Sequence, residues 1–237
     1  MQSMIIGLVD GEPDNLPMEN HLDGGLPAIE VEAAQTLDGN SVYHGTAAGT
    51  VMRRTEIPII HDDGITTERE EVTDQATVNF IADFDTGFVG IDTSKGEFFW
   101  RMMEAHQGIR IARAIIDLRS LRDHLLSLDS VDAWQVGWKD GDDGAGTLFH
   151  DDAELEAGSG ELTQLGVKYF WDGNYVDATI AASGYAAVYS DLTAEQYSAW
   201  VGDVLLPHAM GADTEDEFLE EATETDDEQQ TLGGESA

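Results

Sequence analysis

The fold class is constrained most by residues 76–128, where a hairpin pattern is followed directly by a helical pattern. Residues 76–84 and 88–92 are apolar runs with β-branched and aromatic side chains, and Asp85-Thr86-Gly87 between them has the composition of a tight turn. Strands joined by so short a turn pair in antiparallel fashion. Helical periodicity follows the second strand directly, so this stretch predicts an α+β fold built on an antiparallel sheet.

A helix is predicted immediately after this hairpin. Residues 94–97 have Ser and Glu at the spacing of a capping box. The helix that follows presents Phe99, Met102 and Met103 on one face, which is typical of a helix packed on a core. Gly108 is expected to end it.

A second apolar series, over residues 111–128, has spacings of three and four and predicts another helix. On that helix Arg110 and Arg113 would be neighbours on one polar face. The rival interpretation is a strand over residues 109–116, with Asp117 capping a shorter helix. We favour the helix, because Arg113 would interrupt the apolar face of such a strand.

The same region holds most of the positive charge of a very acidic chain. The chain has 11 Lys and Arg against 48 Asp and Glu, a formal net charge of −37. Residues 95–128 carry six basic and four acidic side chains, a local charge of +6 − 4 = +2. We therefore expect a partner-binding surface there, with aromatic anchors just beyond it. Its members are Arg101, Arg110, Arg113, Arg119, Arg122, Trp134 and Trp138. The alternative is that the arginines pair internally, as the helical i, i+4 spacing of Arg119 and Asp123 would allow.

The acidity also predicts the environment of the protein. At low ionic strength so many like charges repel one another enough to loosen the fold, whereas at about 1 M salt the screening length falls to about 3 Å. The composition resembles that of proteins from salt-in halophiles such as haloarchaea, so we expect a halophilic cytoplasm. The sequence has no cysteine, and no apolar run reaches the roughly 18 residues of a membrane span, so we expect no membrane partner.

Composition divides the chain into three parts. Residues 1–75 contain short apolar runs and many turn signals, and predict a β-rich N-terminal region. Residues 76–210 predict the α+β core, in which residues 76–106 and 165–206 share a strand, turn, strand and helix order. Either an internal duplication or chance would explain this shared order. Residues 213–237 hold eleven acidic side chains and no basic one, so we expect a disordered acidic tail.

The clearest helix lies near the end of that core. Thr193 and Gln196 have capping-box spacing, an apolar stripe begins at Tyr197, and Pro207 is expected to end the helix. The runs before it, within residues 165–190, are typical of an antiparallel meander. The overall expectation is one or more antiparallel sheets covered on one face by two or three amphipathic helices.

Two His-Asp-Asp sequences suggest a different class of function. His61-Asp62 and His150-Asp151 each follow apolar residues that have the pattern of strand ends. Imidazole and carboxylate groups at two such corners, brought together, would bind Zn²⁺ or Mn²⁺ in a metal-dependent hydrolase or nuclease. Asp is abundant throughout this chain, however, and the helical metal-hydrolase spacing H-E-x-x-H is missing from it.

Other catalytic motifs are weak or missing. Asp85-Thr86-Gly87 resembles the Asp-Thr-Gly of aspartic proteases, for which a homodimer would have to supply the second carboxylate, but an ordinary turn explains it better. The sequence has no Gly-rich phosphate loop and no G-x-S-x-G elbow. High salt weakens phosphate contacts, which disfavours nucleic acid and a role as a DNA-associated accessory protein of a mobile element. We therefore expect a non-enzymatic protein, without a cofactor, that binds a protein partner.

The stability of the protein should rise steeply with salt. Because screening reduces the repulsion among 48 acidic side chains, we predict a melting temperature that increases by more than about 10 °C between about 0.1 M and about 3 M KCl. Circular dichroism melts at several KCl concentrations measure this directly. A constant melting temperature over that range would contradict the halophile interpretation.

Overall fold

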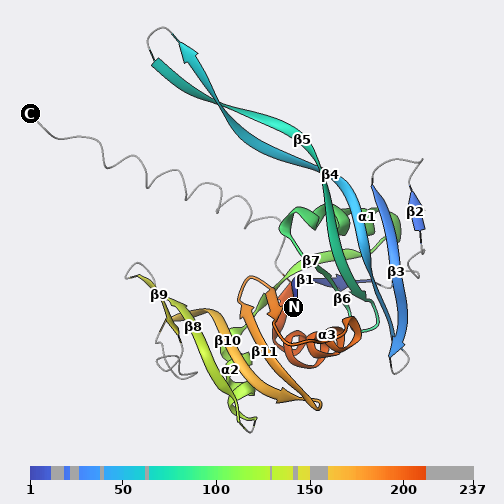
Figure 1. The fold of residues 1–237 in the computed structure, drawn as a ribbon, viewed down its shortest axis with the longest axis vertical. Coiled ribbons are helices and arrows are strands. Elements are labelled where there is room, and N and C mark those ends of the chain that lie inside the picture. Colours follow the sequence, from blue (N-terminus) through green and yellow to red (C-terminus); the bar gives the residue numbers. More distant parts are fainter. Residues whose placement is uncertain are drawn as a thin grey trace, which may run out of the picture.

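The computed structural model describes residues 1–11, 19–21, 27–37, 40–61, 64–128, 130–140, 144–149 and 160–211. Its strands join in one antiparallel network, with three short helices packed against it (Figure 1). The strands of the first half are β1 (Gln2–Asp10), β2 (Glu19–His21), β3 (Ala28–Leu37), β4 (Asn40–His61), β5 (Gly64–Asp83), β6 (Phe88–Ile91) and β7 (Arg110–Ile116). Those of the second half are β8 (Asp132–Lys139), β9 (Ala145–Phe149), β10 (Glu161–Trp171), β11 (Asn174–Ala181), β12 (Tyr185–Val188) and β13 (Ala209–Gly211). The helices are α1 (Glu97–Gln107), α2 (Leu118–Leu126) and α3 (Ala194–Trp200).

The predicted antiparallel α+β class is confirmed, but strands dominate the fold more than we expected. The order across the sheet is β2-β3-β4-β5-β6-β1-β12-β11-β10-β8-β9, with β7 and β13 attached at β1. Helical cover was overestimated because residues 109–116 do not form a helix and because β4 and β5 make one very long hairpin. Among the described residues, none of the helices has the length and apolar character needed to cross a membrane.

The first strand, β1, lies in the middle of this network. On one edge its residues Gln2 to Ile5 pair with β12, and from Gly7 onward the same edge pairs with β7. On the other edge Ile5 to Leu8 pair with β6. A Cβ atom on Gly7 would lie 2.6 Å from Ile111 and 2.9 Å from the Trp100 ring, so the absence of a side chain lets α1 and β7 approach this strand. The predicted boundary at residue 75 falls within β5, and β1 pairs with strands from the later part of the chain.

The helix predicted from the apolar series over residues 111–128 is wrong in its first half. Arg110–Ile116 is strand β7, and Asp117 caps the shorter helix α2 by accepting hydrogen bonds from the backbone N–H groups of Arg119 and Ser120 at 3.0 Å each. Arg113 is compatible with the strand because it is only half-buried and its Nε donates to the Ser183 carbonyl at 2.8 Å. The rival interpretation was therefore the correct one.

The two predicted capping boxes have opposite outcomes. Residues 94–96 form a short 3₁₀ turn, and α1 begins after Gly96 without a side-chain cap, so the box expected there is wrong. A Cβ atom on Gly96 would lie 2.4 Å from the Val78 side chain, which shows that close packing sets this helix start. The box before α3 is confirmed, with reciprocal bonds between Thr193 and Gln196 at 3.0 and 3.3 Å.

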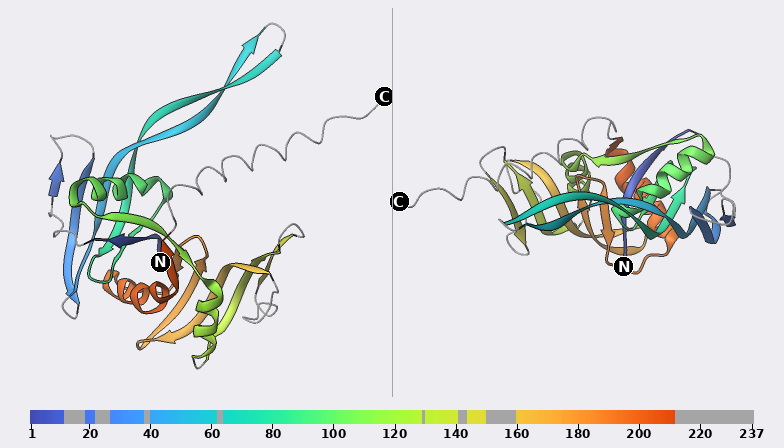
Figure 2. Two further views of the ribbon diagram at one scale, coloured as in Figure 1. Left: turned by 180° about the vertical axis from the view of Figure 1, so that it is seen from behind. Right: turned by 90° about the horizontal axis from the view of Figure 1, so that it is seen from above.

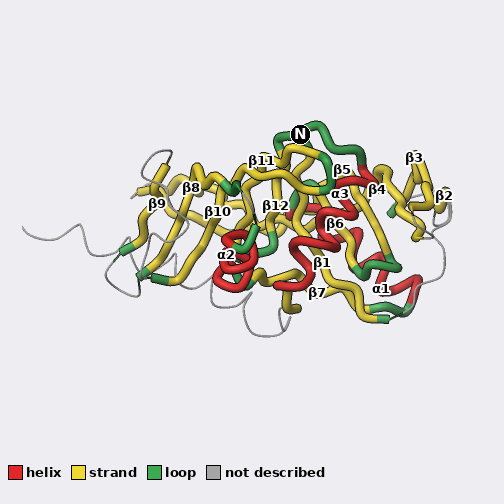
Figure 3. The backbone as a smooth tube through the Cα atoms, turned by 90° about the horizontal axis from the view of Figure 1, so that it is seen from below, coloured by secondary structure: helices red, strands yellow, loops and turns green. Residues whose placement is uncertain are grey.

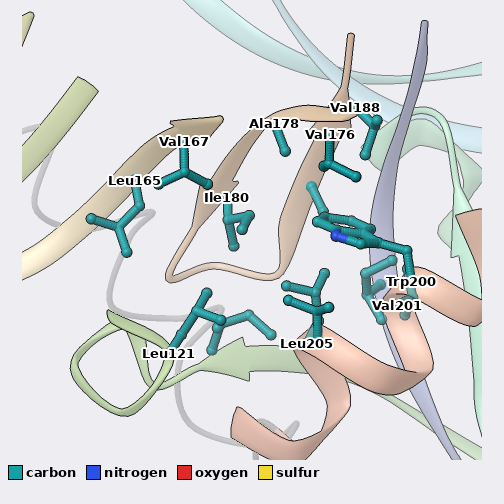
Figure 4. Close-up of a cluster of buried hydrophobic side chains, with 14 of the residues drawn as sticks. Leu121, Leu165, Val167, Val176, Ala178, Ile180, Val188, Trp200, Val201 and Leu205 are labelled. Atoms are coloured by element: carbon teal, nitrogen blue, oxygen red, sulfur yellow. The ribbon is translucent and has the colours of Figure 1, made fainter. Parts of the chain in front are cut away.

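Buried side chains form two clusters on the sheet. The α1 core lies under α1 and includes Phe80 and Phe99, whose rings stack with centroids 4.5 Å apart. The α2/α3 core lies between those two helices and strands β10 to β12 (Figure 4). In it Trp200 points toward the strands, and its Nε1 donates to the Tyr169 hydroxyl at 2.6 Å. Burial raises the pKa of Tyr169, so this phenol remains a neutral hydrogen-bonding partner.

A long two-stranded ribbon, which we call the arm, extends from the α1 core. β4 and β5 pair continuously from Val42 with Asp83 to His61 with Gly64. Pairing of β4 with β3 ends at Ala48, so some 13 residues of β4 project beyond the sheet, roughly 40 Å of strand (Figures 1 and 2). Residues 213–237, predicted to form a disordered tail, lie outside the described residues.

The end of the β4–β5 ribbon opposite the projecting arm is tied to α3 by the buried carboxylate of Asp83, which is 3% exposed. It accepts hydrogen bonds from the Thr86 backbone N–H at 2.9 Å, the Thr86 hydroxyl at 2.7 Å and the Ser198 hydroxyl at 2.7 Å. We predict that Asp83→Ala lowers the free energy of unfolding by about 2–4 kcal/mol, because these donors lose their buried partner. Denaturant titration at high salt measures the loss. The exposed Asp203, changed to Ala, is the control, and an equal effect of both changes would refute the structural role of Asp83.

Candidate functional site

Several basic side chains line a groove at the base of the arm. This cationic groove has a volume of about 730 Å³ and is bounded by β4, β5 and the start of α1. Its charged lining residues are Arg53, Arg54, Lys95 and Arg101, opposed by Glu71, Asp74 and Glu97. Four of the chain's 11 basic residues therefore line one groove, with a local charge of +4 − 3 = +1 in a chain of −37. Arg53 and Arg54 are neighbours on a strand, so their side chains leave opposite faces of the ribbon, and Arg53 shares the face that Gly49 presents to α1.

Close backbone packing makes the walls of this groove. Gly49 of β4 lies directly against the Phe98 ring of α1, since a Cβ atom there would fall 2.1 Å from a ring carbon. This contact holds the arm against the first turn of α1. Arg101 lies one turn further along the same helix. On the arm, Arg53 is paired with Val72 and Arg54 with Glu71. The groove thus joins residues about 45 positions apart in the sequence.

The arginines of the groove are available for binding. Arg54 forms a salt bridge to Glu71 at 3.4 Å, with side chains 75% and 57% exposed. So exposed a pair contributes about 0–1 kcal/mol, so a carboxylate of another molecule can replace Glu71 at little cost. Arg53 and Arg101 are also exposed. The described lining residues include no histidine and no buried acid, which favours binding over proton-transfer chemistry.

Sequence analysis identified only part of this site. Arg101 and Lys95 belong to the predicted basic region, whereas Arg53 and Arg54 were missed. These two are the only adjacent basic residues in the chain, which is a signal that the sequence did contain. Their approach to α1 follows from the strand register and from the packing of Gly49, neither of which sequence periodicity reports.

The other predicted arginines do not gather into one surface. Arg110 and Arg113 point to opposite faces of β7, since they are three residues apart on a strand, so the patch predicted for them is wrong. Arg119 donates from Nη2 to the Gly160 carbonyl at 3.2 Å, and Arg122 pairs with Asp123 at 3.1 Å. These last two lie on α2, far across the molecule from α1 (Figure 3).

The two predicted aromatic anchors are half-buried within this chain. The Trp134 ring lies over Gly166, where a Cβ atom would be 2.8 Å away, and meets the Tyr189 ring edge-on at 6.1 Å. The Trp138 ring packs against Gly146, where a Cβ atom would be 2.5 Å away. Both rings thus have intramolecular partners on β8, apart from the cationic groove, and their role as anchors stays a prediction.

The predicted metal site falls largely on residues that the structure does not describe. Asp62, His150 and Asp151 lie outside the described residues. His61, at the tip of the arm, has its Nε2 2.9 Å from the Thr66 hydroxyl. Within the described ranges no three His, Asp or Glu side chains come close enough to share a metal ion.

A histidine pair near β13 is a further cluster that sequence analysis did not connect. The rings of His124 on α2 and His208 have centroids 5.4 Å apart, and His208 Nδ1 is 2.8 Å from the Ser120 hydroxyl. A serine beside an imidazole is the start of a nucleophile and base pair. The nearby Asp117 carboxylate, however, accepts from the backbone of α2 rather than from the imidazole. The cluster therefore fits a structural contact that ties α2 to the segment before β13.

Comparisons with known proteins add no functional assignment. No protein-family model matches the chain, and no curated protein matches it.

The histidine pair predicts a pH dependence of stability. Burial, and then the proximity of His124, lower the pKa of His208 below its ordinary value, against a smaller opposite effect of Asp117. The unfolded chain therefore binds a proton at His208 more readily than the folded chain does. The stability that depends on a neutral His208 is present above about pH 6.5 and is lost as the pH falls through that value. We predict that the melting temperature of the wild type falls more than that of His208→Asn between about pH 7.5 and about pH 5.5. The exposed His106, changed to Asn, is the control, and parallel curves for the wild type and His208→Asn would contradict the prediction.

Proposed function

We propose that this chain is a non-enzymatic binding protein that holds an acidic segment of a protein partner in the cationic groove. The observation that supports it is that Arg53, Arg54, Lys95 and Arg101 all line one groove of a strongly acidic molecule. The setting that we propose, from composition, is the cytoplasm of a salt-in halophile.

The chemistry of the groove favours carboxylates as ligands. Arginine guanidinium groups bind carboxylates through two parallel hydrogen bonds, and such contacts depend on geometry as well as on charge. Direct contacts of this kind persist at high salt, where long-range attraction is screened. An acidic peptide segment would find several cations within one groove, while the rest of the surface repels it.

Nucleic acid fits the same groove less well. A duplex would bring its phosphates past Glu71, Asp74 and Glu97 as well as past the cations. Phosphate-driven affinity also falls steeply with salt, by roughly one power of the salt concentration for each contact. The groove offers only four cations for such contacts, so we propose a protein partner instead.

Binding of a simple acidic probe tests this proposal. A fluorescent decaglutamate peptide and a fluorescent DNA duplex are titrated with the protein in about 1 M KCl, and anisotropy is measured. We predict that the peptide binds and that Arg53→Gln with Arg101→Gln weakens its binding about tenfold or more, because two guanidinium contacts are lost.

The matched control carries the same change of charge elsewhere. Lys139→Gln with Arg122→Gln also removes two positive charges, both remote from the groove, and should leave peptide binding within about twofold of the wild type. Equal weakening by both pairs would show that only net charge matters. Tighter binding of DNA than of the peptide would reject the proposed partner class.

A further inference from the structure

We infer that the arm is an assembly element that pairs edge to edge with the arm of a second copy of this chain. This inference rests on the proposed function in one respect, since both place recognition on the arm and share Arg53 and Arg54, but it names a different partner and a surface that continues to the tip of the arm. The surface is the pair of free edges of the arm, residues 49–61 of β4 and residues 64–77 of β5.

Both edges of the arm lack a neighbouring strand among the described strands. β3 pairs with β4 no further than Ala48, and β6 pairs with β5 only from Phe80. Alternate residues of each edge therefore direct backbone N–H and C=O groups away from the ribbon, apart from Pro58 of β4, which has no N–H to donate. Such an edge is a template for another strand, and the twenty continuous pairs of the arm contain no bulge that would turn it away.

The arm also exposes more apolar surface than a solvated ribbon needs. Five of the twelve large hydrophobic side chains that are exposed in the described residues belong to it: Met52, Ile57, Ile60, Ile65 and Val72. Ile60 and Ile65 face each other across the ribbon and are 81% and 71% exposed. An isolated two-stranded hairpin is marginal in water, so a partner that covers this surface would stabilise the arm.

Charge selects a second copy in a head-to-tail arrangement. The β4 edge carries Arg53 and Arg54 against Glu56, a charge of +2 − 1 = +1. The β5 edge carries one basic and four acidic residues, a charge of +1 − 4 = −3. Pairing β4 of one copy with β5 of the next brings opposite charges together, whereas β4 with β4 or β5 with β5 brings like charges together. Arms that point the same way would then continue one antiparallel sheet from copy to copy.

Such a contact uses the β4 edge of one copy and the β5 edge of the next, so each copy keeps a free edge to which another copy can bind. A head-to-tail interface closes into a ring when the rotation between copies allows it and otherwise gives a filament. The acidic bodies repel one another at low salt, so assembly should grow with KCl. Binding of an acidic peptide in the cationic groove should instead weaken with KCl, which separates the two processes.

Charge reversal on the two edges tests the inference. Sedimentation velocity of the full chain in about 1 M KCl should show assemblies larger than a dimer. Glu68→Arg with Glu70→Arg makes both edges positive, and Arg53→Glu with Arg54→Glu makes both negative, so each variant alone should dissociate at least tenfold more readily. An equimolar mixture of the two should assemble again with the two variants alternating, because β4 of each variant then meets an oppositely charged β5 of the other.

A variant with a shortened arm tests whether assembly can be lost without a loss of folding. Residues 54–71 are replaced by Asn-Gly, which joins the paired residues Arg53 and Val72 through a two-residue turn. This variant should keep the wild-type melting temperature and sediment as a monomer. A wild type that is monomeric up to about 100 µM, a mixture that stays monomeric, or a shortened arm that still assembles would each overturn the inference.

The outcomes distinguish this inference from the proposed function. Arg101→Gln lies on α1, so it should weaken peptide binding and leave assembly unchanged. Glu68→Arg with Glu70→Arg lies outside the groove lining, so it should prevent assembly and leave peptide binding intact.

Discussion

The pairing of β1 with three other strands is the interaction on which the rest of the fold depends. One edge of β1 passes from β12 to β7, and the other edge holds β6. Along β1 itself, Ile5 belongs to the α1 core and Ile6 to the α2/α3 core, so a nine-residue strand joins both hydrophobic clusters through its two faces. Gly7 is decisive because its missing side chain leaves room for Ile111 and Trp100 at this crossing. Any larger residue there would push β7 or α1 away from the sheet.

Close packing in the body holds the base of the projecting arm. Phe80 and Phe99 stack beneath its root, Gly49 seats it on Phe98, and at the other end of the same ribbon Asp83 accepts a hydrogen bond from Ser198 of α3. These contacts fix the direction of the first residues of the arm, and the continuous β4–β5 ladder carries that direction outward. A flexible loop of the same length would spread its contact residues over many conformations, at an entropic cost on binding.

Electrostatics explains why the groove and the arm stand out from the rest of the surface. In a chain of net charge −37, most of the surface repels acidic partners and other copies of itself. The groove, with a local charge of +1, and the arm, with its two edges of opposite sign, are places where that repulsion is relieved. Salt screens the long-range part and leaves close contacts, so such a surface suits recognition at short range.

Local patterns in the sequence determined the hairpin at Asp85-Thr86-Gly87, the capped start of α3 and the acidic composition. Each depends on residues within a few positions of one another, where turn chemistry, capping and composition act directly. The same patterns failed at residues 109–116, because a strand packed between two cores has no single polar face. Some of its apolar residues pack in the α1 core and others in the α2/α3 core. Only tertiary structure decided that Arg53 and Arg54 line the same groove as Lys95 and Arg101, and that Arg119 and Arg122 lie elsewhere. Those placements depend on strand register and on close approach at Gly49 and Gly96, which are set by contacts between distant segments and leave no periodic trace in the sequence.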